Sequence, residues 1–122
     1  MFNEDVKDTL IDEIIMYAKD YDNWYEDEYD NLYRDNVAAE LEFNLNGLDY
    51  LITVNMGMYV YLTHYPGDYL TPPEVSEKFS ISIYGISIGT YNESTDEDMV
   101  DELSINKVKE VEKEVNKYIN RY

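Results

Sequence analysis

Residues 39–62 read AELEFNLNGLDYLITVNMGMYVYL, and this stretch decides the fold. Its first part alternates apolar and polar side chains, the pattern of a strand with one buried face. The apolar members are Ala39, Leu41, Phe43 and Leu45. Asn46-Gly47 follows and predicts a two-residue hairpin, because both central residues of a type I′ turn take positive φ. The even positions from 50 to 64 are apolar except for the last, which predicts a long returning strand bent near Asn55 or Gly57.

Helical periodicity flanks this hairpin on both sides. From Glu4 to about Asp35 apolar residues recur mostly three or four positions apart, which predicts one helix, or two with a break near Asp22-Asn23. A last helix is predicted from about Ser104 to Tyr122. Its apolar stripe consists of Ile105, Val108, Val111, Val115 and Ile119.

The remaining segments predict a further strand and its connections. Apolar residues alternate with serines from Phe79, and their phase changes across Tyr84-Gly85, which indicates a bulge. The proline-containing segments Tyr65-Pro66-Gly67-Asp68 and Thr71-Pro72-Pro73-Glu74 predict a loop, and Asn92 to Asp101 an acidic connection. We therefore expect a single α+β domain over residues 1–122. It would have a three- to four-stranded antiparallel sheet, with an N-terminal helix (or two) and a C-terminal helix packed on one face.

Charge is the most unusual property of the chain. It has 27 Asp and Glu against 9 Lys and Arg, a net charge of -18, and residues 1–42 alone carry 14 acids and 3 bases. Such a field repels nucleic acids and anionic membranes and attracts basic surfaces. The N-terminus lacks the pattern of a signal peptide and no apolar stretch is long enough to span a membrane, so we expect a cytoplasmic protein.

Residue types that carry catalysis or bind metals are scarce. There is no Cys, one His and no glycine-rich phosphate loop, so we expect no enzyme, no metal centre and no cofactor. His64 is more typical of a structural residue than of a catalytic one. Carboxylates alone could bind Ca²⁺, but an EF-hand loop requires a central Gly, and no Gly precedes Gly47.

The strongest candidate site is a run of carboxylates. Its members are Asp20, Asp22, Glu26, Asp27, Glu28, Asp30 and Asp35, opposed only by Arg34. On a helix the 16 residues from Asp20 to Asp35 would span about 24 Å. Their net charge would then be about one per 4 Å, close to the roughly 3.4 Å per charge of one DNA strand. The run is either a solvated surface or a substitute for phosphates. We predict a partner-binding surface made of this run together with Glu40, Glu42, Tyr25 and Tyr29.

Tyrosines offer a second kind of surface. Tyr17, Tyr21 and Tyr25, four residues apart, are more typical of an inward helix stripe than of a binding platform. Tyr59 and Tyr61 alternate with buried residues of the long strand, and they would be interface anchors if exposed.

In size, in the acidic and tyrosine-rich run from Asp20 to Asp35, and in its lack of catalytic residues, the chain resembles small acidic bacteriophage proteins that disarm host defence: antirestriction proteins, anti-CRISPR proteins and other DNA mimics. Its proline-containing loop is similar to a loop of short phage proteins. The resemblance implies a non-enzymatic inhibitor in the host cytoplasm that occupies the basic nucleic-acid groove of a CRISPR effector or restriction enzyme. An acidic immunity protein or antitoxin that neutralises a basic toxin, and a general protein-interaction module, are the alternatives.

Overall fold

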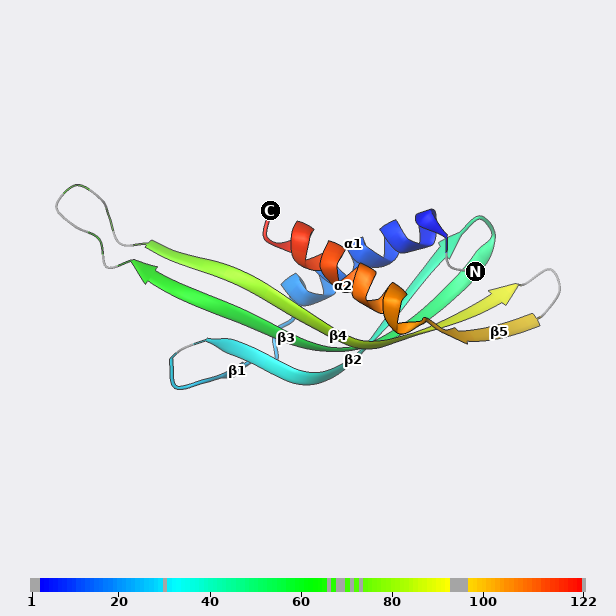
Figure 1. The fold of residues 1–122 in the computed structure, drawn as a ribbon, viewed down its shortest axis with the longest axis horizontal. Helices are drawn as coiled ribbons and strands as arrows, with labels where there is room; N and C mark the ends of the chain where they lie inside the picture. The colour runs from blue at the N-terminus through cyan, green and yellow to red at the C-terminus, as the bar shows by residue number, and fades with distance from the viewer. Residues whose placement is uncertain are drawn as a thin grey trace.

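The computed structural model describes residues 3–29, 31–65, 74–92 and 97–121, together with positions 67, 70 and 72. Its elements are α1 (Glu4–Asp20), β1 (Tyr25–Glu26), β2 (Leu32–Leu45), β3 (Leu48–Tyr65), β4 (Glu74–Asn92), β5 (Glu97–Glu102) and α2 (Ile105–Ile119). The strands form one antiparallel sheet in sequence order, and both helices lie on its concave side (Figure 1). The predicted α+β class is confirmed, with five strands rather than three or four.

The hairpin between β2 and β3 forms at the predicted place. Leu45 pairs with Leu48, and Asn46 and Gly47 have φ of 54° and 81°. From this turn β3 continues as the central strand, paired along one side with β2 and along the other with β4. The alternation read from the sequence therefore becomes two faces of one sheet.

Two bulges at the same level bend the sheet. In β2, Asp35 and Asn36 lie between the pairs Arg34–Met58 and Val37–Met56, so two residues oppose Gly57 alone. In β4, Tyr84 is the extra residue between the partners of Asn55 and Met56, which confirms the predicted bulge. Bulged strands bend and twist, and the sheet curves around the helices (Figure 1). The long strand β3 itself is not interrupted.

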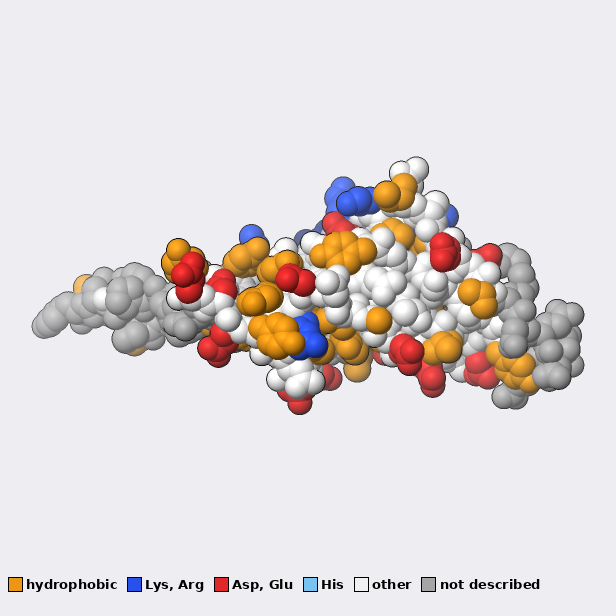
Figure 2. Space-filling view, turned by 90° about the horizontal axis from the view of Figure 1, so that it is seen from below, with side chains coloured by type: hydrophobic (Ala, Val, Ile, Leu, Met, Phe, Trp, Pro, Cys, Tyr) orange, Lys and Arg blue, Asp and Glu red, His pale blue; other side chains and the backbone are white. Residues whose placement is uncertain are grey.

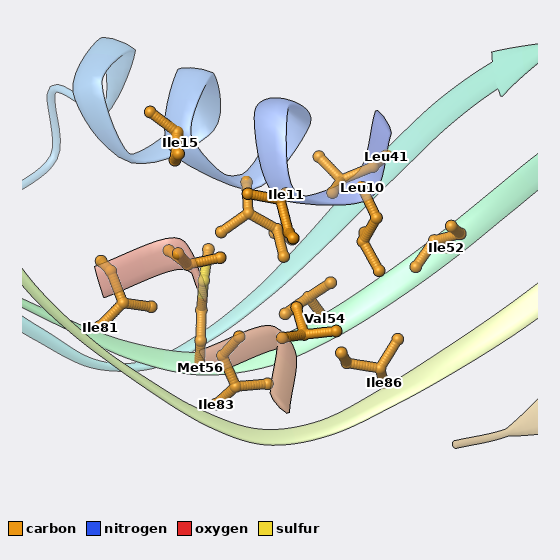
Figure 3. Packing of buried hydrophobic residues seen from close by; sticks show 14 of the residues in the cluster. Leu10, Ile11, Ile15, Leu41, Ile52, Val54, Met56, Ile81, Ile83 and Ile86 are labelled. Atoms are coloured by element: carbon orange, nitrogen blue, oxygen red, sulfur yellow. The ribbon is translucent and has the colours of Figure 1, made fainter. Parts of the chain in front are cut away.

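The core lies between the concave face and the two helices. Figure 3 shows side chains of α1, β2, β3 and β4 meeting there, among them Leu10, Leu41, Val54 and Ile83. Leu10 and Val54 are fully buried, and so are Val111 and Val115 of α2. Each such side chain stabilises the fold by roughly 1.5–3 kcal/mol relative to its exposed state.

Helix α2 also covers an edge of the sheet. The side-chain amides of Asn116 and Asn120 each accept a hydrogen bond from the backbone N–H, and donate one to the C=O, of Ile81 and Phe79 respectively. Glu112 accepts from the N–H of Ile83 at 2.8 Å. Four residues of a helix rise about 6 Å, and two residues of a strand span about 6.6 Å. Side chains four residues apart on α2 therefore match backbone groups two residues apart on β4. These side chains take the place of a missing neighbour strand.

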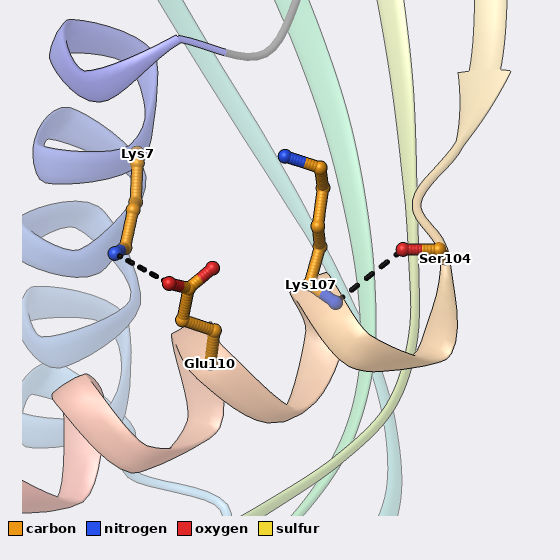
Figure 4. A network of polar contacts seen from close by, with 4 residues as sticks. All are labelled: Lys7, Ser104, Lys107 and Glu110. Atoms are coloured by element: carbon orange, nitrogen blue, oxygen red, sulfur yellow. Dashed lines mark hydrogen bonds and ion pairs between the residues drawn. The ribbon is translucent and has the colours of Figure 1, made fainter.

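Both helices begin with a side-chain cap. Asn3 accepts from the N–H of Val6 at 2.9 Å, and Ser104 accepts from the N–H of Lys107 at 3.4 Å. Between the helices, Lys7 Nζ lies 3.6 Å from Glu110 Oε1 (Figure 4). Lys7 is 13% exposed and Glu110 57%, so this partly exposed pair contributes about 1 kcal/mol, and apolar packing holds the helices together.

Three sequence predictions are wrong. No helix covers residues 21–35, because α1 ends at Asp20 with extended backbone at Tyr21. Strands β1 and β2 contain most of the aromatic residues that follow. The predicted acidic connection contains strand β5, a short charged edge strand of a kind that discourages edge-to-edge association. Ile105 was expected on the buried stripe but is 73% exposed, because it is the first residue of α2; the other four stripe residues are buried. Most of the predicted proline loop lies outside the described residues.

We expect Asn116→Ala to lower the free energy of unfolding by about 1–3 kcal/mol, since it leaves two backbone groups of Ile81 without partners. Asn106→Ala, at an exposed position of the same helix, should change it by less than about 0.5 kcal/mol. Urea denaturation measures both. Equal effects of the two substitutions would contradict a stabilising role for the edge contacts.

Candidate protein-binding face

The helices leave one whole face of the sheet uncovered, and we call it the outer face. Odd-numbered residues of β3 from Asp49 to Tyr61 project onto it, because even-numbered ones such as Ile52 and Val54 are buried against the helices. Residues paired across the strands share a face, so the register identifies the rest of this surface. Figure 2 shows this side, where orange and red side chains are spread over the sheet and blue ones are few.

Five tyrosines form a continuous group on the outer face, which we call the tyrosine patch: Tyr25, Tyr33, Tyr59, Tyr61 and Tyr84. Tyr25 pairs with Tyr33, and Tyr33 with Tyr59, across three strands. The rings of Tyr25 and Tyr33 are 5.9 Å apart, and those of Tyr59 and Tyr61 stack at 6.4 Å. Tyr25, Tyr61 and Tyr84 are 53%, 47% and 60% exposed, so the patch is open to a partner.

Asp35 fixes the middle of the patch. The hydroxyl of Tyr59 donates to Asp35 Oδ1 at 2.5 Å. This hydrogen bond to a carboxylate, together with desolvation and the charge of Asp35, raises the pKa of Tyr59 to about 12. The bulge at Asp35-Asn36 brings the carboxylate within reach of the ring, so one backbone irregularity both bends the sheet and orders the patch.

Gly57 explains how the hydroxyl end of Tyr84 reaches the central strand. A Cβ at position 57 would lie 2.6 Å from the Tyr84 hydroxyl and 3.1 Å from the backbone oxygen of Asp35. Only Gly leaves this space for both neighbours. The absence of a side chain at Gly57 therefore lets the tip of the Tyr84 ring contact the middle of β3 on the outer face.

Carboxylates extend the outer face beyond the patch. Strand register places Glu40, Glu42, Asp49 and Glu102 there, and the hydrogen bond with Tyr59 places Asp35 there. The described bases nearest this face are Lys78, paired with Tyr61, and Arg34, whose guanidinium lies 4.3 Å from the centre of the Tyr25 ring. At the end of the face away from the patch, a hollow of about 730 Å³ has Leu51, Gly89 and Val100 in its lining, with Glu42 and Asp49.

The predicted acidic site is divided between two sides of the molecule. Asp20 and Asp22 lie at the end of α1, on the helix side, and line a groove with Tyr17 and Leu41. Glu26, Asp27 and Glu28 lie in β1 and the turn after it, and Tyr29 is exposed in that turn. Asp35, Glu40, Glu42 and Tyr25 share the outer face. Asp30 lies outside the described residues. A single straight ridge of carboxylates is not formed.

Asp27 has a structural role in the turn between β1 and β2. Its Oδ1 accepts from the N–H groups of Tyr29 and Asn31, and its Oδ2 from the Asn31 side chain. Desolvation would raise the pKa of Asp27, but these hydrogen bonds outweigh it and the pKa is lowered. The turn explains why a sequence with helix-like spacing forms a hairpin at this point.

The two helices differ in the sign of their charge, since α1 carries six acids and two bases and α2 four bases and three acids. Within the described residues, no ion pair involves the carboxylates of positions 20–42. Of the nine bases of the chain, five lie between 104 and 121, where only three acids occur. These bases are Lys107, Lys109, Lys113, Lys117 and Arg121. The acidic surface therefore remains unneutralised while α2 is locally positive.

Four members of the face were missed at the level of sequence: Tyr33, Tyr84, Asp49 and Glu102. Tyr33 lies in the segment that the sequence predicts to be helical, and Glu102 directly follows the predicted acidic connection. Neither residue could therefore be assigned to a face of the sheet. Tyr84 was recognised only as part of a bulge. The sequence did contain a signal for Tyr84, which lies directly before Gly85 at the predicted bulge. A bulge can turn such a side chain towards the outer face, although the alternation of the strand is lost there.

Among the described residues, no group of three or more His, Asp and Glu side chains is arranged to hold a metal ion. No helix in the described ranges is both long and apolar enough to cross a membrane. Comparison with protein-family models, with curated proteins and with solved structures finds no match to this chain.

We expect Asp35→Asn to move the pKa of Tyr59 from about 12 towards 10. Because the folded state raises this pKa, the contact stabilises the protein below about pH 10, and that stabilisation disappears as the pH rises to about 12. NMR titration of the tyrosine ring signals measures the change. Glu40→Gln removes the same charge without contacting Tyr59 and should leave its pKa unchanged; an equal shift would mean that the hydrogen bond is not the cause.

Proposed function

We propose that this protein is a non-enzymatic binding protein whose outer face engages a basic, nucleic-acid-handling protein and thereby excludes nucleic acid from it. The observation that carries the proposal is the uncovered sheet face on which five tyrosines adjoin five carboxylates. An inhibitor of a CRISPR effector or a restriction enzyme would act in this way.

The chemistry of the face suits a partner rich in Arg and Lys. Tyrosine rings bind guanidinium and ammonium groups through cation–π contacts, and the contact between Arg34 and Tyr25 is an example within the chain. Carboxylates next to the rings add charge-assisted hydrogen bonds. Tyrosine is also enriched among the residues that dominate binding energy at interfaces.

Mimicry of DNA by regular phosphate spacing has weaker support than mimicry by charge alone. Glu40 and Glu42 are two residues apart on a strand, about 6.6 Å, which is roughly twice the 3.4 Å per charge of one DNA strand. The net charge of -18 still directs the protein towards the surfaces that attract nucleic acid. The proposal is therefore competition for a basic surface.

Stability alone gives no reason for this distribution of charge. Asp20 and Asp22 lie at the C-terminal end of α1, where the helix dipole disfavours negative charge. Repulsion among the acids of the chain also opposes the compact state. A function that uses the charge accounts for both.

Capture on the immobilised protein from nuclease-treated bacterial lysate tests the proposal. We expect the retained proteins to be basic and to bind nucleic acid, to elute as salt rises, and to be displaced by added duplex DNA. Retained proteins that are insensitive to salt and to DNA would contradict it, and would favour an interaction module whose acidity serves solubility.

The tyrosine patch should contribute most of the affinity for such a partner. We expect Tyr61→Ala/Tyr84→Ala to weaken binding by about thirtyfold or more, as expected when exposed aromatic anchors are removed. Ile105→Ala removes an exposed apolar side chain of α2 and should have little effect. Surface plasmon resonance with the captured partner measures both. If the two variants bind alike, the outer face is not the interface.

The carboxylates of β2 should act by position rather than through net charge. Glu40→Gln/Glu42→Gln and Asp8→Asn/Asp12→Asn each remove two charges, the first pair from the outer face and the second from α1. We expect the first double variant to weaken binding about tenfold and the second less than about threefold, with a shallower salt dependence for the first. Equal weakening would indicate long-range attraction without contact at β2.

A further inference from the structure

The two long edges of the sheet are treated differently by the fold. Along β4, the side chains of Glu112, Asn116 and Asn120 bond to the backbone at residues 79–83. Along β2, residues 37–45 pair with β3 on one side, and no described residue bonds to their backbone on the other. An uncovered strand edge is a template for a further strand.

The register identifies which backbone groups of β2 point outward. The N–H of Ile83 donates to Glu112, so Ile83 faces away from β3, and its partner Met56 must face β2. Val37, paired with Met56, therefore bonds to β3. Bonded and outward residues alternate along a strand, so the outward N–H and C=O groups are those of Ala38, Glu40, Glu42 and Asn44. All four of these residues are exposed.

The side chains beside this edge differ on its two faces. On the outer face, Glu40 and Glu42 would lie directly opposite the residues of an added strand. On the helix side, a groove of about 460 Å³ between α1 and β2 is lined by Met16, Tyr17, Tyr21 and Leu41, and by the carboxylates of Glu13, Asp20 and Asp22. One face of the edge therefore selects basic side chains, and the other accepts apolar ones.

We propose that the free edge of β2 binds an extended segment of a partner protein in which Lys or Arg alternates with apolar residues. The basic side chains pair with Glu40 and Glu42, and the apolar ones enter the groove beside Leu41. The backbone of the segment bonds to the four outward residues, so the sheet gains a strand. This inference concerns the sheet edge, and it stands whether or not the outer face binds a nucleic-acid-handling protein.

A second copy of this chain does not fit the same edge. Antiparallel pairing of two β2 strands would bring Glu40 and Glu42 of one copy against the same carboxylates of the other, and like charges opposite one another destabilise a sheet. Each copy also carries a net charge of -18. Charge complementarity therefore selects a basic segment over self-association.

A labelled synthetic peptide of alternating Lys and Val tests the proposal, with a block peptide of the same composition as control. Fluorescence anisotropy should show the alternating peptide binding at least about tenfold more tightly, because only it presents one kind of side chain to each face. Equal binding of the two peptides, or no binding of either, overturns the proposal.

Amide hydrogen exchange identifies the binding edge independently of any variant. The alternating peptide should slow exchange at Ala38, Glu40, Glu42 and Asn44, and leave the odd-numbered residues between them, already bonded to β3, nearly unchanged. Binding without this even-numbered pattern places the peptide elsewhere and overturns the proposal.

Ala38→Pro keeps every carboxylate and removes one outward N–H that β3 does not use, so the strand should remain paired. We expect it to weaken peptide binding about fivefold or more, and Asp8→Asn/Asp12→Asn, which alters charge on α1, to weaken it less than about threefold. If Ala38→Pro binds as the unaltered protein does, backbone pairing is not used. Because the probe is a peptide and the variants spare the tyrosines, failure here leaves the capture experiment on the outer face unaffected.

Discussion

The central strand β3 sets the arrangement of everything around it through the strict alternation of its side chains. Its even-numbered residues supply the core under the helices, and its odd-numbered residues supply the outer face. If β2 or β4 lost or gained one residue relative to β3, its apolar side chains would turn from the core to the outer face. The bulges at Asp35-Asn36 and Tyr84 absorb such irregularities next to Gly57, so apolar residues return to the core on both sides of the bend.

The same bulges create the features that a partner could recognise. They place Asp35 against Tyr59 and lay Tyr84 over Gly57, which orders aromatic side chains that an ordinary strand would leave mobile. Ordered tyrosines lose little entropy when a partner binds, so a pre-arranged patch binds more tightly than the same residues on a loop. Here the irregularity of the sheet and its binding potential have one structural cause.

The two long edges of the sheet are protected from further strand pairing in different ways. Side chains of α2 cover the edge of β4, and the short, acidic β5 covers the rest of that side. The edge of β2 is protected instead by the negative charge of Glu40 and Glu42, which repels other copies of this chain and anionic molecules but not basic segments. Carboxylates that prevent aggregation would therefore also select the partner.

The sequence by itself determined what depends on neighbouring residues: the Asn46-Gly47 hairpin, the bulge at Tyr84, the C-terminal helix from Val108 onward and the excess of negative charge. These follow from local conformational preference and periodicity, which short segments carry within themselves. Tertiary structure decided where the acids of residues 20–35 lie, because the Asp27 turn and pairing with β3 overrode a helix-like spacing. It also decided which tyrosines meet and which edge stays open. Both depend on strand register and on helix placement, which join residues far apart in the chain.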